Sequence, residues 1–188
     1  MLLWVAFAVI SAGLVAASWR ALRVPGSHGF YRFFAWEAIA ALFLINSHAW
    51  FSTPLSVPQI LSWFLLCVSL LLIIPGAYQF RVDGKASLKQ ESSSRKEDAT
   101  LFPFERTSEL VTSGIYRYIR HPLYGSLLFL AWGVTAKEVT AASVLLAGVA
   151  TLFLWLTSKA DESECSRYFG AAYDEYMKRT KMFVPFLW

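Results

Sequence analysis

The chain has 188 residues, of which 56% are hydrophobic, 16% aromatic and 16% charged. Soluble domains typically carry about 25% charged residues, so this composition argues against a soluble protein and favours one that spans a membrane. The net charge of +4 comes from basic residues that border apolar runs, which indicates anchoring at a membrane surface rather than binding to nucleic acid.

The stretch 1–80 forms the first predicted unit, with three transmembrane helices. Residues 1–19 are uncharged and precede Arg20, whereas a signal peptide would carry its basic residues before the apolar stretch. Residues 38–80 lack a formal charge and are too long for one span, and the prolines of 52–58 divide them into two helices. A turn-rich loop is expected at 25–29.

Two ionisable residues are expected near the ends of the second helix. These are Glu37 and His48, which we interpret as interfacial. The second unit, residues 81–110, changes character and is predicted to be a charged cytoplasmic loop. It contains a polar stretch at 90–98 and returns to the membrane at 102–104.

The third unit, residues 111–188, is predicted to contain a transmembrane hairpin followed by an amphipathic helix. The apolar arms are 122–136 and 139–158, and we expect 116–121 to complete the first arm as helix. Gly133 is predicted to let the two arms approach closely. Apolar residues then recur at three- and four-residue spacing, which predicts an amphipathic helix over 159–181. They are Cys165, Tyr168, Phe169, Ala172, Tyr173 and Tyr176.

The distribution of Lys and Arg predicts the topology. Sixteen of the 17 basic residues fall on one side of the proposed spans, and the remaining one is Lys137. By the positive-inside rule the 81–110 loop and the C-terminus are cytoplasmic and the N-terminus is outside. The expected fold is an all-α, multi-pass integral membrane protein with about five transmembrane helices and a C-terminal amphipathic helix.

The stretch 113–125 is the candidate functional motif. Pro122 suits the first turn of a helix, which places Arg120 and His121 at that helix's N-terminal end. Unpaired backbone N–H groups there favour an anionic group such as a carboxylate. The alternative is that these cations only anchor the chain at the interface. The two cysteines and the absence of metal-ligand spacing argue against a disulfide framework and a metal site.

The C-terminal part of the chain, from Leu110 onward, resembles the integral-membrane methyltransferases typified by isoprenylcysteine carboxyl methyltransferase, with the phospholipid N-methyltransferases as relatives. Leu-Val-Thr-Ser-Gly-Ile-Tyr at 110–116, followed by Arg-His-Pro-Leu-Tyr-Gly at 120–125, resembles the family motif. Asp161-Glu162 stands where the family carries a Glu pair, and Tyr173, Tyr176 and the stretch 183–185 resemble the family's tail.

The resemblance implies an S-adenosylmethionine-dependent methyltransferase with a cytoplasm-facing cofactor pocket. The cofactor's sulfonium and ammonium require carboxylates, and its carboxylate requires Arg or a helix N-terminus. The residues expected to bind it are Leu110, Val111, Tyr116, His121, Pro122, Leu123, Tyr124, Asp161 and Glu162. The residues expected to take part in catalysis are Arg120, His121 and Glu162.

The methyl acceptor is expected to be lipid-like or membrane-embedded, but its identity and acceptor atom stay open. Asp161 is one methylene shorter than the family's Glu, and Thr157 stands where the prenylcysteine enzymes carry a substrate-binding Arg. An amine-lipid N-methyltransferase is therefore one alternative to an isoprenylcysteine-type enzyme. Alternatives of another class are a non-catalytic lipid-binding membrane protein and an NADPH-dependent enzyme resembling the sterol reductases.

Overall fold

A computed structural model describes residues 1–83 and 109–184. Within these ranges the chain is helical and contains no strand, which confirms the all-α prediction. The features predicted at 90–98 and 102–104 lie outside the described residues. The helices are α1 (Leu2–Leu22), α2 (His28–Ile45), α3 (Val57–Asp83), α4 (Pro122–Thr135), α5 (Ala141–Phe169) and α6 (Ala171–Arg179), with 3-10 turns η1 (Ser47–Ala49) and η3 (Gly114–Arg117).

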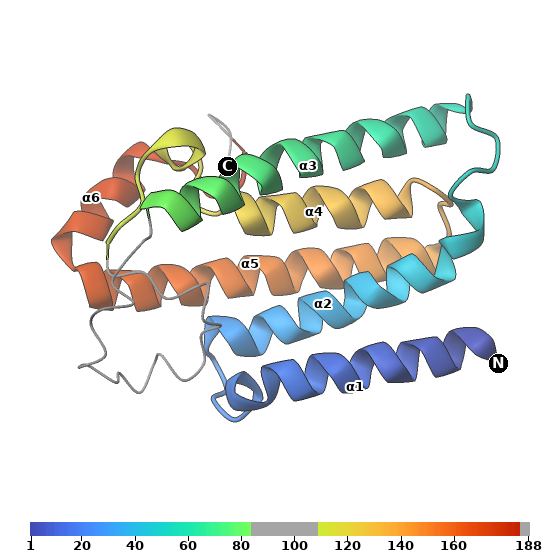
Figure 1. The fold of residues 1–188 in the computed structure, drawn as a ribbon, viewed down its shortest axis with the longest axis horizontal. Helices are drawn as coiled ribbons and strands as arrows, with labels where there is room; N and C mark the ends of the chain where they lie inside the picture. Colours follow the sequence, from blue (N-terminus) through green and yellow to red (C-terminus); the bar gives the residue numbers. More distant parts are fainter. Residues whose placement is uncertain (84–108, 185–188) are drawn as a thin grey trace.

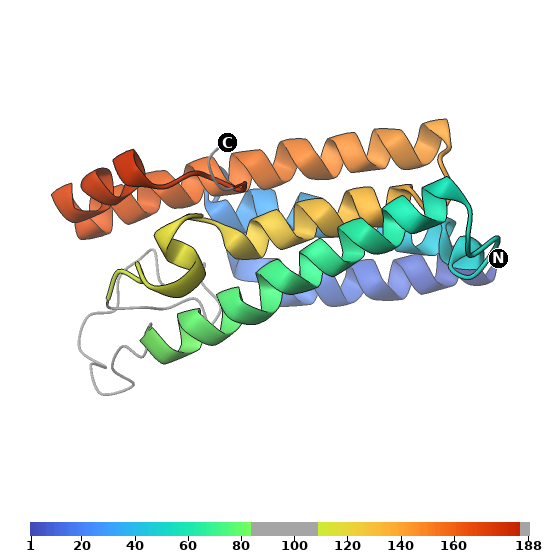
Figure 2. The same cartoon turned by 90° about the horizontal axis from the view of Figure 1, so that it is seen from above.

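Helices α1 to α5 run side by side as a bundle, and α6 and η3 lie together at one end (Figures 1 and 2). The connection from α2 to α3 and that from α4 to α5 lie at the other end, as does the N-terminus. Helix α2 packs mainly on α5, α3 on α4, and α1 on α2. The α1–α2 connection and the chain after α5, which are rich in Lys and Arg, thus lie at one end of the bundle. The two connections that are poor in Lys and Arg lie at the other end.

Small side chains fill much of the bundle core, which lets the helices approach closely. Ala38, Ala131, Ala147 and Ala150 are buried there beside Leu42. Large apolar side chains instead cover the outer faces of the long helices, as expected where lipid is the solvent. Examples are Val9 of α1, Phe64 and Leu71 of α3, and Leu145 of α5.

Among the described helices, α1, α3 and α5 are long and apolar enough to cross a membrane. This supports an integral membrane protein. The predicted count of five spans is not established, because α4 has only 14 residues and α2 contains Arg32 and Glu37.

Helix α2 begins ten residues earlier than predicted. The Oγ of Ser27 accepts a hydrogen bond from the Phe30 N–H at 3.1 Å, which caps a helix that starts at His28. The prediction for Glu37 was therefore wrong: it lies in the middle of α2, where its Oε2 accepts a 2.6 Å hydrogen bond from the Ser11 hydroxyl of α1.

The prediction that 116–121 completes the first hairpin arm as helix was also wrong. After the short η3 turn the backbone is extended, because the residue before a proline avoids the helical region; His121 has φ −123° and ψ 61°. Its backbone pairs with the C-terminal segment instead. The N–H of Arg120 donates to the Lys181 carbonyl at 2.8 Å, and that of His121 to the Met182 carbonyl at 3.1 Å.

Two further boundaries in the C-terminal unit differ from the prediction. Helix α5 continues past 158 to Phe169, and it ends where Gly170 adopts φ +59°, so the predicted helix over 159–181 is split. Gly133 also lies at a different helix–helix contact from the predicted one. A Cβ placed on it would lie 3.0 Å from Leu66 Cδ2, so it permits the approach of α4 to α3 rather than to α5.

Candidate functional site

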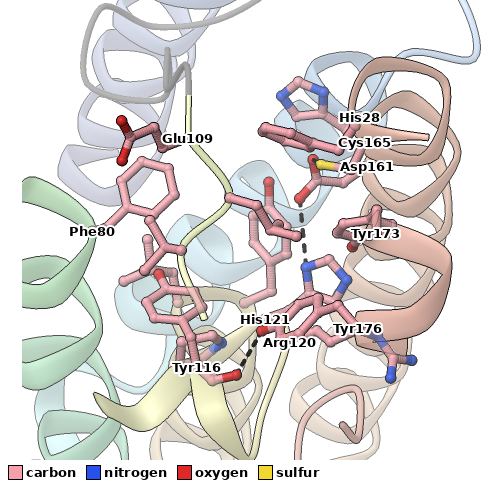
Figure 3. Close-up of a pocket in the computed structure, with 16 residues that line it drawn as sticks. His28, Phe80, Glu109, Tyr116, Arg120, His121, Asp161, Cys165, Tyr173 and Tyr176 are labelled. Atoms are coloured by element: carbon pink, nitrogen blue, oxygen red, sulfur yellow. Dashed lines mark hydrogen bonds and ion pairs between the residues drawn. The ribbon is translucent and has the colours of Figure 1, made fainter. Parts of the chain in front are cut away.

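A pocket of about 140 Å³ lies where η3, the start of α4, the end of α5 and α6 meet (Figure 3). Nine of the predicted site residues line it, although they come from two segments that lie far apart in the sequence. They are Leu110, Val111, Tyr116, Arg120, His121, Pro122, Leu123, Tyr124 and Asp161. The structure thus brings the sequence motif together with the first of the two predicted acids.

His121 lies between the two acids of α5. Its Nδ1 is 3.4 Å from Asp161 Oδ2, and its Nε2 is 3.6 Å from Glu162 Oε1, which is too long for a hydrogen bond. Burial opposes a positive charge on this imidazole, but Asp161 and Glu162 outweigh it and raise the pKa of His121 above its ordinary value. The two carboxylates therefore favour the protonated ring. Its buried Nε2 has no hydrogen-bond partner among the described residues.

Arg120 joins α5 to the C-terminal segment. Its Nε donates to Glu162 Oε1 at 2.9 Å and its Nη2 lies 2.8 Å from the same oxygen. Its Nη1 donates to the backbone carbonyls of Met177 and Thr180. Most of its N–H groups thus donate hydrogen bonds within the protein. This favours a structural role for Arg120, which clamps α5 to the C-terminal segment. The predicted catalytic part for Arg120 stays a prediction.

Glu162 and Thr157 do not line the pocket. Glu162 is 7% exposed and lies behind His121, where Lys159 Nζ also contacts it at 2.9 Å. Thr157 is fully buried, and its hydroxyl donates to the Phe153 carbonyl at 2.7 Å. Glu162 is therefore expected to act on a bound cofactor only indirectly, through its contacts with His121 and Arg120.

Three tyrosines form an aromatic wall beside His121. The hydroxyl of Tyr176 donates to the Tyr116 carbonyl at 2.6 Å, which ties α6 to η3. Burial raises the pKa of Tyr116, Tyr173 and Tyr176, so all three are neutral phenols at neutral pH. The ring of Tyr124 stacks on His121 with their centroids 5.6 Å apart. The wall offers flat apolar faces and no phenolate.

Sequence reasoning missed several lining residues, among them His28, Phe80, Glu109 and Cys165. Figure 3 shows His28 and Cys165 beside Asp161, and Phe80 and Glu109 across the pocket from them. His28 comes from α2, far from the motif in sequence. The helix-capping residue Ser27 could have indicated that a helix starts there, but no local pattern places it next to α5.

Several proteins similar to this chain are named as methyltransferases. A family model described as phospholipid methyltransferase matches residues 91–172. A probable protein-S-isoprenylcysteine O-methyltransferase from Oryza sativa subsp. indica is 30% identical over 129 residues, which cover 66% of this chain and 63% of the relative. These matches support an integral-membrane methyltransferase similar to this family.

Other relatives match over shorter stretches. A methanethiol S-methyltransferase from Crocosphaera subtropica is 28% identical over 76 residues, covering 40% of this chain and 29% of the relative. The human protein-S-isoprenylcysteine O-methyltransferase is 31% identical over 84 residues, covering 43% of this chain and 29% of the relative. The chain thus matches less than a third of the length of each of these two relatives.

Proposed function

We propose that this chain is an S-adenosylmethionine-dependent methyltransferase whose acceptor is a small or lipid-like molecule that enters from the membrane. The observation that carries the proposal is the convergence of the motif at 110–124 and Asp161 on one pocket. The relatives' printed names support it, since they describe methyl transfer to isoprenylcysteine and to methanethiol.

The residues present fit the methyl donor. Asp161, with 25% of its side chain exposed, offers a carboxylate to a sulfonium or an ammonium. His121 has a buried Nε2 without a hydrogen-bond partner among the described residues, and on the imidazolium this nitrogen can donate to a carboxylate. Leu110, Val111 and Leu123 supply apolar surface for an adenine ring.

The donor would supply an activated methyl group on a sulfonium. The chain's own contribution is to align the reactants and to exclude water. Val111 and Tyr116 are almost fully buried, and the Tyr176 hydrogen bond holds the η3 turn against α6. An acceptor that is already an anion needs no base, whereas a thiol or an ammonium must lose a proton.

Location in the membrane follows from the same proposal. We infer that the pocket end of the bundle faces the cytoplasm, because Arg20, Arg117, Lys159 and Arg179 belong to this end. Lys137, at the other end, is buried against the rings of Trp50 and Trp63.

Binding of S-adenosylhomocysteine to the purified full chain in detergent tests the proposal. We expect this product analogue to bind and to raise the unfolding temperature, and Asp161→Asn to weaken binding about tenfold or more, the loss of one charged hydrogen-bond partner. Asp174→Asn, on the exposed face of α6, is the matched control and should bind as the wild type does. Stabilisation by NADPH with no response to S-adenosylhomocysteine would overturn it.

A second experiment identifies the acceptor. Membranes that contain the chain are incubated with methyl-labelled S-adenosylmethionine, and the labelled product is identified by mass spectrometry. Label in a lipid or a small thiol that depends on Asp161 supports the proposal. Absence of any label above that of the Asp161→Asn membranes contradicts it.

A further inference from the structure

The pocket has two opposite walls with different chemistry (Figure 3). On one wall His121 and Asp161 lie 3.4 Å apart, and the proposed function gives these residues the methionyl end of the methyl donor. The wall across from them contains Phe80 of α3 and Glu109. The proposed binding of the donor makes no use of these two residues.

Glu109 differs from the other acids of the site in its surroundings. Asp161 faces His121, and Glu162 lies 2.8 Å from Arg120. Glu109 is exposed, and no hydrogen bond or ion pair joins its carboxylate to another residue within 1–83 and 109–184. A carboxylate accepts hydrogen bonds and donates none. Both of its oxygens are thus available to hydroxyl or amino groups of a ligand in the pocket.

Flat and apolar side chains surround this carboxylate. Leu110 and Val111 follow Glu109 directly in the chain and line the same pocket. The ring of Phe80 lies beside that of Tyr116, with their centroids 6.1 Å apart. Apolar faces next to a single acid suit a nucleoside, whose base needs apolar surface and whose ribose carries hydroxyl donors.

The connectivity of the methyl donor directs its nucleoside toward this wall. One carbon joins the sulfonium to the ribose, so a methionyl part bound at Asp161 leaves the adenosyl part to extend toward the other side of the pocket. The adenosyl group has hydrogen-bond donors in its two ribose hydroxyls and in the adenine amino group. The two neighbouring hydroxyls match the two oxygens of one carboxylate, whereas the amino group donates from a single nitrogen.

We propose that Glu109 recognises the ribose of the methyl donor, with both ribose hydroxyls donating to its carboxylate, and that the adenosyl group lies along the wall formed with Phe80. The proposal rests on the proposed function and deepens it. Glu109 immediately precedes the motif that begins at Leu110, and Phe80 belongs to the first half of the chain. Neither residue was among the site residues expected from the sequence.

Ligands with and without the ribose hydroxyls test this contact. Calorimetry measures the binding of S-adenosylhomocysteine and of its 2′,3′-dideoxy analogue to the full chain in detergent. We expect the wild type to bind the dideoxy analogue about tenfold or more weakly, the loss of hydrogen bonds to a charged group. Glu109→Ala should weaken S-adenosylhomocysteine by a similar factor and change the affinity for the dideoxy analogue by less than about threefold, because the two changes remove the same interaction.

Three variants serve as controls. Glu109→Gln retains one acceptor oxygen and should lose less affinity than Glu109→Ala. Glu175→Gln removes an acid with a 67% exposed side chain from α6, outside the pocket, and should bind both ligands as the wild type does. Asp161→Asn should weaken both ligands equally, since both keep the methionyl ammonium. Without ligand, Glu109→Ala should unfold at the wild-type temperature, because an exposed side chain without a partner contributes little to stability.

Three results would overturn the inference. Wild-type affinity of Glu109→Ala for S-adenosylhomocysteine would remove Glu109 from the donor site. An equal loss for both ligands would show that Glu109 acts on another part of the donor or on the shape of the pocket. A loss that disappears with the inosine analogue but persists with the dideoxy analogue would assign Glu109 to the adenine amino group instead of the ribose. Failure of the wild type to bind S-adenosylhomocysteine would instead refute the proposed function itself.

Discussion

His121 Nδ1 lies 3.4 Å from Asp161 Oδ2, across the junction between the extended backbone before α4 and the last turns of α5. This contact joins the sequence motif to the acidic pair that follows it much later in the chain. With Glu162 on the other side of the ring, the buried imidazole lies between two carboxylates. Such an arrangement responds to pH and to the removal of any one member.

The first prediction concerns pH. The folded-state pKa of His121 is raised, so its contribution to stability is fully present below the ordinary value of about 6.5 and is lost as the pH rises through the raised pKa. The unfolding temperature in detergent should therefore fall as the pH rises above about 6.5 and through the raised pKa. His121→Gln should remove this part of the pH dependence, and Asp161→Asn should shift it to lower pH. A pH profile identical in all three proteins would contradict the assignment.

The second prediction concerns the ion pair of Arg120 and Glu162. Their side chains are only 11% and 9% exposed, so removing one partner leaves a buried charge. Arg120→Met and Glu162→Gln should each lower the free energy of unfolding by about 3–5 kcal/mol, and the double variant should lose less than the sum. Unfolding by titration with a denaturing detergent measures the free energy of unfolding of each variant.

An exposed ion pair provides the matched control for that experiment. Lys178 and Glu175 lie 2.9 Å apart with side chains 72% and 67% exposed, and Lys178→Met should change stability by less than about 1 kcal/mol. If Arg120→Met were as mild as this control, the clamp between α5 and the C-terminal segment would be unimportant for the fold.

The third prediction concerns two glycines in neighbouring helices. A Cβ on Gly133 would lie 3.0 Å from Leu66 Cδ2 and 3.3 Å from the Leu66 backbone nitrogen, so Gly133→Ala should cost about 1–3 kcal/mol by overpacking. Gly148 of α5 has nothing within 4 Å of the same position, and Gly148→Ala should be neutral or stabilising by up to about 1 kcal/mol. Thermal unfolding of both variants checks the contrast, and equal effects would refute the α3–α4 contact.

The fourth prediction concerns topology. In a background with Cys67 and Cys165 replaced by Ala, cysteine is introduced at Leu55, which is 88% exposed in the α2–α3 connection, or at Lys178 of α6. A membrane-impermeant maleimide should label the first from outside intact cells and the second only after permeabilisation. Labelling of Lys178→Cys from outside would reverse the proposed orientation.

Much of the site could be predicted from sequence because its residues lie within two short segments. The segment at 110–124 is local, and Pro122 fixes where α4 begins. Asp161 could be placed at the pocket only through the resemblance to a family. His28 could not be placed, because its contact with Glu164 spans 136 residues and depends on how α2 packs against α5.

The helix boundaries show the same limit. Runs of uncharged residues locate the apolar part of a helix. The helix itself can continue into the charged sequence on either side. Helix α2 starts ten residues before the uncharged run at 38, and α5 continues eleven residues beyond the run that ends at 158. Capping by Ser27 and the positive φ of Gly170 set these ends, and both act through backbone geometry that hydropathy does not report.

The fifth prediction concerns Thr157, where the resemblance suggests that an Arg would restore a substrate contact. Thr157 follows Phe153 by one turn of α5, and Phe153 stacks on Phe34 of α2 with their centroids 5.0 Å apart. Glu164, two turns further on the same face, pairs with His28 of α2. Thr157 therefore faces α2 between these two contacts, which agrees with its complete burial.

An arginine at 157 would place a cation inside the buried α2–α5 interface. We expect Thr157→Arg to lower the free energy of unfolding by more than about 3 kcal/mol, because a buried charge without a partner is costly. Thr157→Val, of similar volume, should cost about 1–2 kcal/mol, and Ala172→Arg on the exposed face of α6 should cost almost nothing. The measurement is detergent-titrated unfolding, with turnover of a prenylcysteine analogue assayed alongside. A stable Thr157→Arg protein that methylates this analogue faster than the wild type would show that α2 and α5 separate enough to admit the substrate, contrary to the packing described.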